Sequence, residues 1–201
     1  MANRRTPIER VCIFCGSRLG NRPIYRSHAA RVAALLAERG IGIVYGGGSI
    51  GLMGVVADAA LRAGGEVIGV IPEVLMAREF AHPNLTRLHI VRTMHERKAL
   101  MSDLADGFIA LPGGFGTLDE LFEIVTWAQL GIHTKPVVLL NSGDYYRHLL
   151  ASLRHAVDEG FIAPEHAGLL AVTDDPEEAV EAVLTYHPPV AIPRWMGREE
   201  R

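Results

Sequence analysis

The chain alternates short apolar runs with longer segments whose apolar residues recur every three to four positions. The apolar runs predict strands at 11–15, 41–45, 66–71, 88–91, 107–111, 136–140 and 170–173. The helical periodicity predicts helices at 24–39, after Gly51 through Arg62, and at 94–104, 117–130, 145–159 and 176–186. Nearly continuous apolar strands that alternate with helices are typical of parallel sheets covered on both faces. The sequence therefore predicts a doubly wound, mostly parallel, Rossmann-like α/β fold.

A single domain is expected over residues 1–186. A chain of 201 residues can bury one sizeable core without disulfides or metals, and its apolar fraction of 49% is ordinary for a globular protein. Residues 73–83 are the least regular part of this domain. Residues 187–201 combine proline and charge without periodicity, so we expect them to form a C-terminal tail.

Charge narrows the choice of partner. The formal net charge of −3 provides no positive field for nucleic acid or for an anionic membrane surface. The basic N-terminus runs directly into the first strand, and no apolar stretch has the length of a signal-peptide core or a membrane span. We therefore expect a cytoplasmic protein that binds a small molecule, with no nucleic-acid partner and no membrane contact.

The sequence predicts no metal site. Cys12 and Cys15 form a C-x-x-C, but they lie in or at the end of an apolar run without a second pair of ligands, so we expect two buried thiols. The nine histidines show no metal-binding spacing such as H-E-x-x-H.

Two glycine loops each follow a predicted strand and precede a predicted helix. Gly113, Gly114 and Gly116 form the first, where helix N–H groups can hold a phosphate and Thr117 adds a hydroxyl. The second spans 46–51. In an open parallel sheet both loops face the carboxyl ends of the strands, so together they favour a phosphate-bearing ligand over two empty turns.

Other nucleotide chemistries fit these loops less well. The second loop matches G-x-G-x-x-G, with Glu73 after the next strand, so a nicotinamide dinucleotide is an alternative. That loop follows the second strand rather than the first, however, and no hydride-acceptor site is evident. No G-x-x-x-x-G-K-[ST] is present, which argues against hydrolysis of a nucleoside triphosphate.

Two motifs make the chain recognisable. MHERKALM at 94–101, followed by LPGGFGTLDE at 111–120, resembles the Lonely Guy family of cytokinin riboside 5′-monophosphate phosphoribohydrolases. CGS at 15–17, YGGGSIGLMG from Tyr45 and TWAQLGIHTKP from Thr126 extend the resemblance from residue 11 to about 175. It implies a hydrolase that cleaves the N-glycosidic bond of an N6-substituted adenosine 5′-monophosphate, without a cofactor and as a homodimer.

The resemblance also implies roles for particular residues. It makes Arg97 and Glu120 the catalytic pair. Further residues are implied to bind substrate: Glu79, Lys98, Gly114, Phe115, Gly116, Thr117, Leu118, Asp119 and Thr126. Four more are candidates for the lining of the site: Ser17, Gly46, Gly47 and Gly48.

Several of these residues have simpler explanations. Thr117 and Glu120 form T-x-x-E, the capping box in which both side chains serve the start of a helix. Arg97 and Lys98 on an amphipathic helix, and Glu79 in a loop, are equally typical of solvated charges. No independent physical argument supports Thr126. The functional alternatives are a nucleosidase for AMP or other nucleotides, and a nucleotide-binding module without catalysis.

Members of this family are often labelled lysine decarboxylases. That chemistry requires pyridoxal phosphate held by a lysine Schiff base. The lysines of this chain are Lys98 and Lys135, and Lys135 precedes Pro136 at the start of a strand, which is the wrong end for an α/β site. The sequence therefore argues against decarboxylation.

Glycosidic cleavage suggests how the charged pair would work. Positive charge develops on the ribose, so Glu120 is expected near the anomeric carbon, while Arg97 orients it or assists departure of the base. The phosphate would serve as an anchor. The helix expected at 117–130 is apolar around much of its circumference, which predicts a second subunit against one side.

Overall fold

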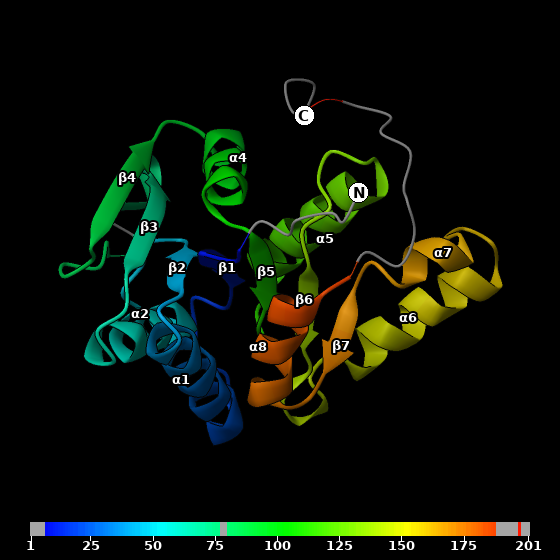
Figure 1. The fold of residues 1–201 in the computed structure, drawn as a ribbon, viewed down its shortest axis with the longest axis horizontal. Helices are drawn as coiled ribbons and strands as arrows, with labels where there is room; N and C mark the ends of the chain where they lie inside the picture. The colour runs from blue at the N-terminus through cyan, green and yellow to red at the C-terminus, as the bar shows by residue number, and fades with distance from the viewer. Residues whose placement is uncertain (1–6, 77–79, 188–196, 198–201) are drawn as a thin grey trace.

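The computed structural model describes residues 7–76, 80–187 and 197. Its centre is a seven-stranded sheet in the order β4-β3-β2-β1-β5-β6-β7, in which all neighbouring strands are parallel (Figure 1). The strands are β1 (Arg10–Phe14), β2 (Gly42–Tyr45), β3 (Val67–Pro72), β4 (Arg87–Val91), β5 (Gly107–Ala110), β6 (Val137–Leu140) and β7 (Ala171–Thr173). The predicted doubly wound α/β fold is confirmed.

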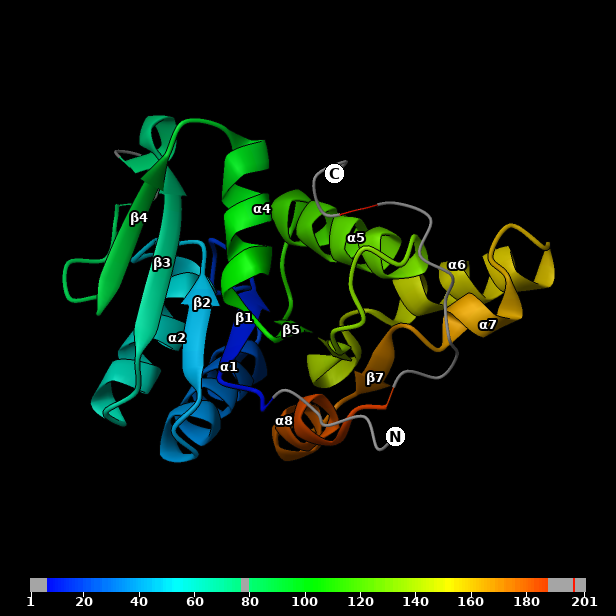
Figure 2. The same cartoon turned by 45° about the horizontal axis from the view of Figure 1, so that its top comes forward.

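Helices cover both faces of this sheet. They are α1 (Pro23–Glu38), α2 (Gly51–Arg62), α4 (Met94–Leu104), α5 (Phe115–Gln129), α6 (Arg147–Asp158), α7 (Pro164–Ala167) and α8 (Pro176–Thr185), with short 3₁₀ turns η1 (Glu73–Leu75) and η2 (Ser142–Asp144). Helices α1, α2 and α8 pack on one face, while α4 and α5 lie on the other (Figure 2).

Strand β1 shows why its apolar run is continuous. Successive side chains point to opposite faces of a strand. Val11 and Ile13 pack in the core against α1, α2 and α8, whereas Cys12 and Phe14 pack in the core against α4 and α5. Both faces are buried, so neither set of positions can be polar.

The strand order places a crevice beside β1. The chain builds β1 to β4 outward in one direction, and α4 then returns it to β5 on the other side of β1. Ligands bind at such a switch point, beyond the carboxyl ends of the strands. Backbone hydrogen bonds join the loops there: the N–H of Gly16 donates to the carbonyl of Pro112 at 3.1 Å, and that of Leu52 donates to the carbonyl of Gly16 at 3.0 Å.

Two helix boundaries differ from the prediction. The helix expected to begin at Thr117 begins at Phe115, because Gly116 is accommodated in its first turn. The helix expected at 145–159 is limited to Arg147–Asp158 and is preceded by η2, where Gly143 has a positive φ of 57°. The predicted tail lies outside the described residues except for His187 and Gly197. Within the described part of the chain, no helix has the length and hydropathy needed to cross a bilayer.

Candidate active site

A cavity of about 160 Å³ lies at the switch point. Its walls include eight of the residues singled out from the sequence: Ser17, Gly46, Arg97, Gly114, Phe115, Gly116, Thr117 and Glu120. Five others were not anticipated: Ile13, Cys15, Gly16, Met53 and Met94. Apolar side chains at the end of a buried strand and in helices carry no individual signal, so only the strand order brings them to the site.

Buried charge is concentrated beside this cavity. Among the described residues, the buried charged side chains other than histidine are Arg97, Lys98 and Glu120. Arg97 and Glu120 line the cavity with exposed fractions of only 5% and 9%. Since an isolated buried charge is strongly unfavourable, an acid and a base held together in one cavity are typical of a functional site.

Two backbone carbonyls, one in β3 and one directly after β2, orient Arg97. Its Nε donates to the carbonyl of Val70 at 3.1 Å, and its Nη2 donates to the carbonyl of Gly46 at 3.0 Å. A Cβ added at Gly46 would lie 2.1 Å from the same Nη2. A side chain at Gly46 would therefore displace the guanidinium from its hydrogen-bonded position.

The start of α5 forms the open side of the cavity. Gly114 is the N-cap residue and provides no side-chain cap, and the first turn contains no acidic residue. A Cβ added at Gly114 or Gly116 would meet no atom within 4 Å, so the space above this helix end is empty of protein. The first amides of a helix lack internal partners, and they favour an anion such as a phosphate.

The capping-box explanation of Glu120 is wrong. Because α5 begins at Phe115, Thr117 lies within its first turn rather than at the N-cap, and Glu120 lies in the second turn. A capping box requires the threonine at the N-cap and the glutamate three residues later. The side chain of Glu120 faces the cavity instead.

Lys98 lies beside the cavity but outside its lining. Its Nζ is 3.0 Å from Oδ2 of Asp119 and 2.9 Å from Oε1 of Glu123, so it joins α4 to α5. Burial lowers the pKa of Lys98, but its hydrogen bonds to Glu123 and Asp119 outweigh this effect and raise the pKa above its ordinary value. The charge of Lys98 is thus paired within the protein.

The other residues implied by the resemblance lie elsewhere. Leu118 of α5 is partly buried against the core, and Thr126 is exposed further along that helix. Gly47 adopts a positive φ of 80°, and a Cβ added there would lie 3.2 Å from Leu88 and 3.3 Å from Ile71. The carbonyl of Gly48 accepts a hydrogen bond from the hydroxyl of Tyr45. Glu79 lies outside the described residues.

The second glycine loop is closed by protein. A Cβ added at Gly51 would lie 2.2 Å from the backbone of Ser17, and the N–H of Leu52, the second residue of α2, already donates to Gly16. A dinucleotide pyrophosphate would need this helix end to be open. The geometry therefore disfavours the nicotinamide alternative.

The cysteines are buried thiols, as predicted. Burial raises the pKa of the Cys15 thiol far above its ordinary value; the nearby charge of Glu120 raises it further, and Arg97 opposes them. Cys15 therefore contributes a neutral wall to the cavity. The described residues contain no group of three or more potential metal ligands.

Comparisons with known proteins find relatives that match most of the chain. The chain is 47% identical over 188 residues to a cytokinin riboside 5′-monophosphate phosphoribohydrolase of Arabidopsis thaliana, with 94% of this chain and 87% of the relative covered. It is 49% identical over 181 residues to the enzyme of that name from Rhodococcoides fascians, with 90% and 91% covered.

Solved structures of lower identity share the fold. The Moco carrier protein of Chlamydomonas reinhardtii superposes with a TM-score of 0.66 at 22% identity, covering 89% of this chain and 96% of that chain. A molybdenum cofactor binding protein of Rippkaea orientalis gives 0.64 at 21% identity, with 90% and 97% covered. At this identity only the architecture is comparable.

The matching family model, described as "Possible lysine decarboxylase", spans residues 53–183. The two lysines do not fit that chemistry. A Schiff-base lysine needs an accessible neutral amine, but Lys98 is paired with two carboxylates. The Nζ of Lys135 donates to the carbonyls of Ser102 and Ala105 at 2.7 and 2.5 Å, just before the amino end of β5.

The family follows from the two relatives and from the family model together, and the cavity of Arg97 and Glu120 fits it. The chain belongs to the Lonely Guy family of cytokinin riboside 5′-monophosphate phosphoribohydrolases.

Proposed function

We propose that this protein hydrolyses the N-glycosidic bond of an N6-substituted adenosine 5′-monophosphate to the free base and ribose 5-phosphate. The observation that carries the proposal is the pairing of a buried Arg97 and a buried Glu120 in one cavity, next to the open amino end of α5. The names of the relatives support the same reaction.

The phosphate belongs at the amino end of α5. The backbone amides of Gly114, Phe115 and Gly116, with the hydroxyl of the buried Thr117, form a set of donors without a neighbouring acid. Binding energy gained at the phosphate positions the ribose over Glu120, which lies one turn further along the helix. Two anions in contact would repel, so the carboxylate serves the ribose rather than the phosphate.

Glu120 and Arg97 divide the chemistry between them. Cleavage of the C1′–N9 bond leaves positive charge on the ribose, which the carboxylate of Glu120 stabilises while it orients the attacking water. Water adds at C1′, loses a proton and gives ribose 5-phosphate, and the departing base takes up a proton. Arg97, fixed by two backbone carbonyls, holds the carboxylate in place or assists departure of the base.

The remaining residues act around this centre. Ser17 and Gly46 form part of the wall beside Arg97, and Gly47 and Gly48 continue the loop behind Gly46. Lys98 acts through Asp119 and Glu123 by fixing α4 against α5, and it keeps Arg97 opposite Glu120. Leu118 packs α5 against the core. Contacts of Glu79 and Thr126 with substrate are proposed from the family resemblance alone.

We place the protein in the cytoplasm as a homodimer with a nucleotide as its small-molecule partner. A net charge of −3 supports the absence of nucleic-acid and membrane partners. The half-buried apolar side of α5 supports the dimer.

One assay decides between the candidate functions. Purified protein is incubated with isopentenyladenosine 5′-monophosphate, AMP and adenosine at matched concentrations, and the released bases are quantified by chromatography. We expect the isopentenyl nucleotide to be cleaved most efficiently and adenosine at least about 100-fold less efficiently than the nucleotides, because it lacks the anchor. Preference for AMP would indicate a general nucleosidase. Binding of the nucleotides without release of any base would indicate a non-catalytic module.

A further inference from the structure

The loop between β5 and α5 has three consecutive carbonyl groups, each bonded to a donor elsewhere in the protein. The carbonyl of Leu111 accepts from the hydroxyl of Tyr146 at 2.7 Å, and that of Gly113 accepts from the hydroxyl of Tyr145 at 2.6 Å. The carbonyl between them, of Pro112, accepts from the N–H of Gly16 at 3.1 Å. The two tyrosines are adjacent in the sequence and follow η2 at the carboxyl end of β6.

Peptide geometry gives these hydrogen bonds a consequence for the cavity. The C=O and the N–H of one trans peptide point in opposite directions. The carbonyl of Gly113 points to Tyr145, in the segment that follows β6, so the N–H of Gly114 in the same peptide points to the opposite side of the loop, away from that segment. The cavity lies on that side, where Gly16, Ser17 and Gly114 line it.

We propose that Tyr145 and Tyr146 are positioning residues that orient the β5–α5 loop, so that the amide of Gly114 and the first amides of α5 point into the cavity to bind a phosphate. This inference rests on the proposed function. Neither tyrosine lines the cavity, so both act through the backbone. A hydroxyl that donates to a carbonyl also polarises the peptide and makes its N–H a stronger donor.

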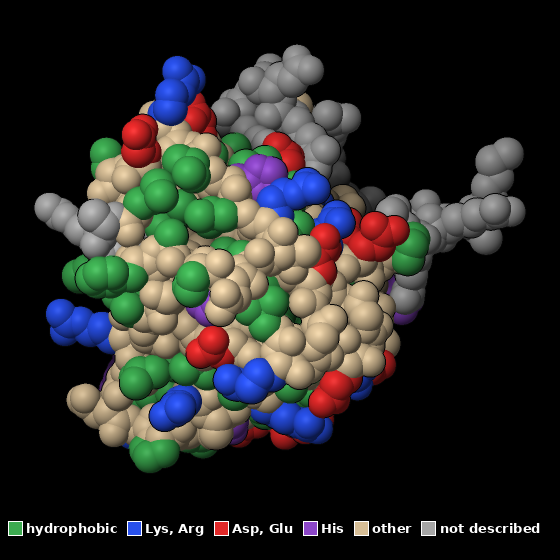
Figure 3. All heavy atoms as spheres, turned by 90° about the vertical axis from the view of Figure 1, so that its left-hand side faces the viewer, with side chains coloured by type: hydrophobic (Ala, Val, Ile, Leu, Met, Phe, Trp, Pro, Cys, Tyr) green, Lys and Arg blue, Asp and Glu red, His purple; other side chains and the backbone are tan. Residues whose placement is uncertain are grey.

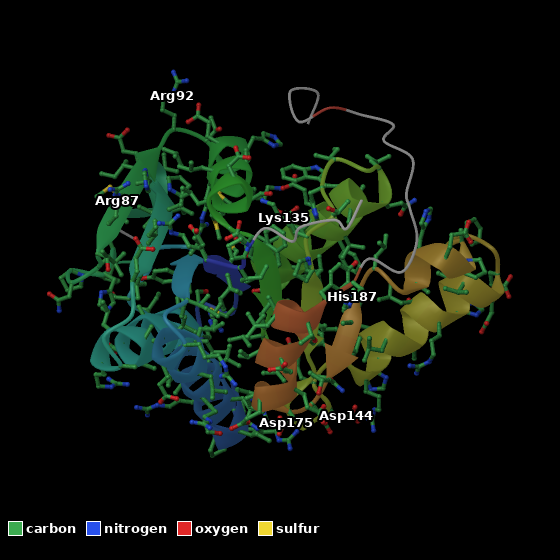
Figure 4. The ribbon with its side chains drawn as sticks, viewed as in Figure 1. Arg87, Arg92, Lys135, Asp144, Asp175 and His187 are labelled. Atoms are coloured by element: carbon green, nitrogen blue, oxygen red, sulfur yellow. The ribbon has the colours of Figure 1, made fainter. Side chains whose placement is uncertain are left out.

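The surroundings of the tyrosines fix their hydroxyl groups. The ring of Tyr145 packs edge-on against Tyr146 at 4.7 Å and against Tyr25 of α1 at 5.7 Å between centroids. Arg22 bonds to the carbonyl of Gly143 and lies 5.8 Å from the centroid of Tyr25, so the start of α1 buttresses the cluster. Asp144, labelled in Figure 4, is the last residue of η2 and directly precedes the two tyrosines.

Tyr146 is held more tightly than Tyr145. It is buried, and burial raises the pKa of its phenol above the ordinary value, although a backbone hydrogen bond with Gly113 lowers it in part. The phenol therefore keeps its proton and remains a donor at physiological pH. Tyr145 is exposed on one side, so removal of its hydroxyl leaves the packing of the core unchanged.

The test removes each hydroxyl alone. Tyr145→Phe and Tyr146→Phe keep the rings, and Tyr25→Phe is the matched control from the same aromatic cluster, since no hydrogen bond of its hydroxyl to the loop is found among the described residues. Binding of ribose 5-phosphate and of ribose is measured by titration calorimetry. KM and kcat for isopentenyladenosine 5′-monophosphate are measured in parallel.

We expect Tyr145→Phe to weaken binding of ribose 5-phosphate about fivefold and to raise KM by a similar factor, with little change in kcat. Tyr145→Phe should bind ribose, which lacks the phosphate, as the wild type does. Tyr25→Phe should bind ribose 5-phosphate with wild-type affinity. Tyr146→Phe should act in the same direction. If it unfolds, Tyr145→Phe decides the question alone.

Two results would overturn the inference. One is an unchanged affinity for ribose 5-phosphate in Tyr145→Phe, and the other is a wild-type protein that binds ribose 5-phosphate no better than ribose. Failure of the proposed function looks different. Wild-type protein would then release no base from any nucleotide, yet Tyr145→Phe would still weaken the binding of ribose 5-phosphate.

Discussion

At the scale of single residues, Glu120 is the proposed catalytic carboxylate. Glu120→Gln preserves the size of a buried side chain and removes the negative charge that the ribose cation requires. We expect kcat to fall by at least about 100-fold. Circular dichroism and the melting temperature should remain close to the wild-type values, which separates loss of charge from loss of fold. Turnover near the wild-type rate would exclude Glu120 from catalysis.

Cys15 provides a second test at this scale, because burial and the charge of Glu120 raise the pKa of its thiol. The folded protein keeps the thiol protonated, whereas the unfolded chain ionises near pH 8.5. The unfolded state then binds fewer protons, so the free energy of unfolding falls as the pH rises above about 8.5. Urea titrations at pH 7 and pH 9.5 should show a smaller loss in Cys15→Ala than in the wild type.

Alkylation checks the same thiol directly. Iodoacetamide at pH 8 should modify both cysteines of the unfolded chain rapidly and those of the native protein slowly, as measured by intact mass, because the thiolate is the nucleophile. Rapid modification of native Cys15 would contradict the neutral wall that the structure places in the cavity.

At the scale of elements, the packing of α4 on α5 gives the neighbouring cations Arg97 and Lys98 different surroundings. Arg97 faces the cavity, while Lys98 joins α4 to Asp119 and Glu123 of α5. We expect Arg97→Ala to lower kcat more than Lys98→Ala does. We expect Lys98→Ala to lower the free energy of unfolding by about 2 kcal/mol, because it leaves Glu123 partly buried without its partner. Equal losses of kcat in the two variants would contradict this division.

The elements also show what sequence patterns can predict. The strands were predicted correctly because strands such as β1 are buried on both faces and therefore have continuous apolar runs. The loop before α5 was located because glycines interrupt a strand-to-helix junction. The start of α5 was misplaced by two residues, since Gly114 and Gly116 are unfavourable in a helix and conceal its first turn. The sequence did not predict that Met53, Met94 and Cys15 line the cavity, because any apolar residue at these positions would have given the same periodicity. The carboxylate partners of Lys98 could not be predicted either, because they depend on how α4 packs against α5.

At the scale of the whole molecule, two helices retain apolar sides that the described residues, 7–76, 80–187 and 197, leave partly exposed. Leu121, Ile124 and Ala128 of α5 are buried against the sheet, but Phe122 is 38% exposed and Trp127 is only half-buried. No residue of α6 is fully buried, although half-buried apolar positions form a stripe along it: Leu149, Leu150, Leu153, Ala156 and Val157.

The β4 edge is a competing surface. Figure 3 faces this side and shows hydrophobic side chains among charged ones, and Ile90 of β4 is 56% exposed. Charged residues near an edge strand oppose pairing with another chain. Arg87 and Arg92 lie at the two ends of the β4 segment (Figure 4), so this edge is the less suitable interface.

The dimer prediction follows from this contrast. A two-fold contact buries the same surface on both subunits, so one charge on α5 places two charges in the interface. Light scattering at low micromolar concentration should give at least twice the mass of one chain for the wild type and the mass of one chain for Phe122→Glu. Ile90→Glu, the matched control, should keep the wild-type mass. Dissociation by Ile90→Glu alone would assign the interface to the β4 edge, and a fully active wild-type monomer would show that α5 needs no partner.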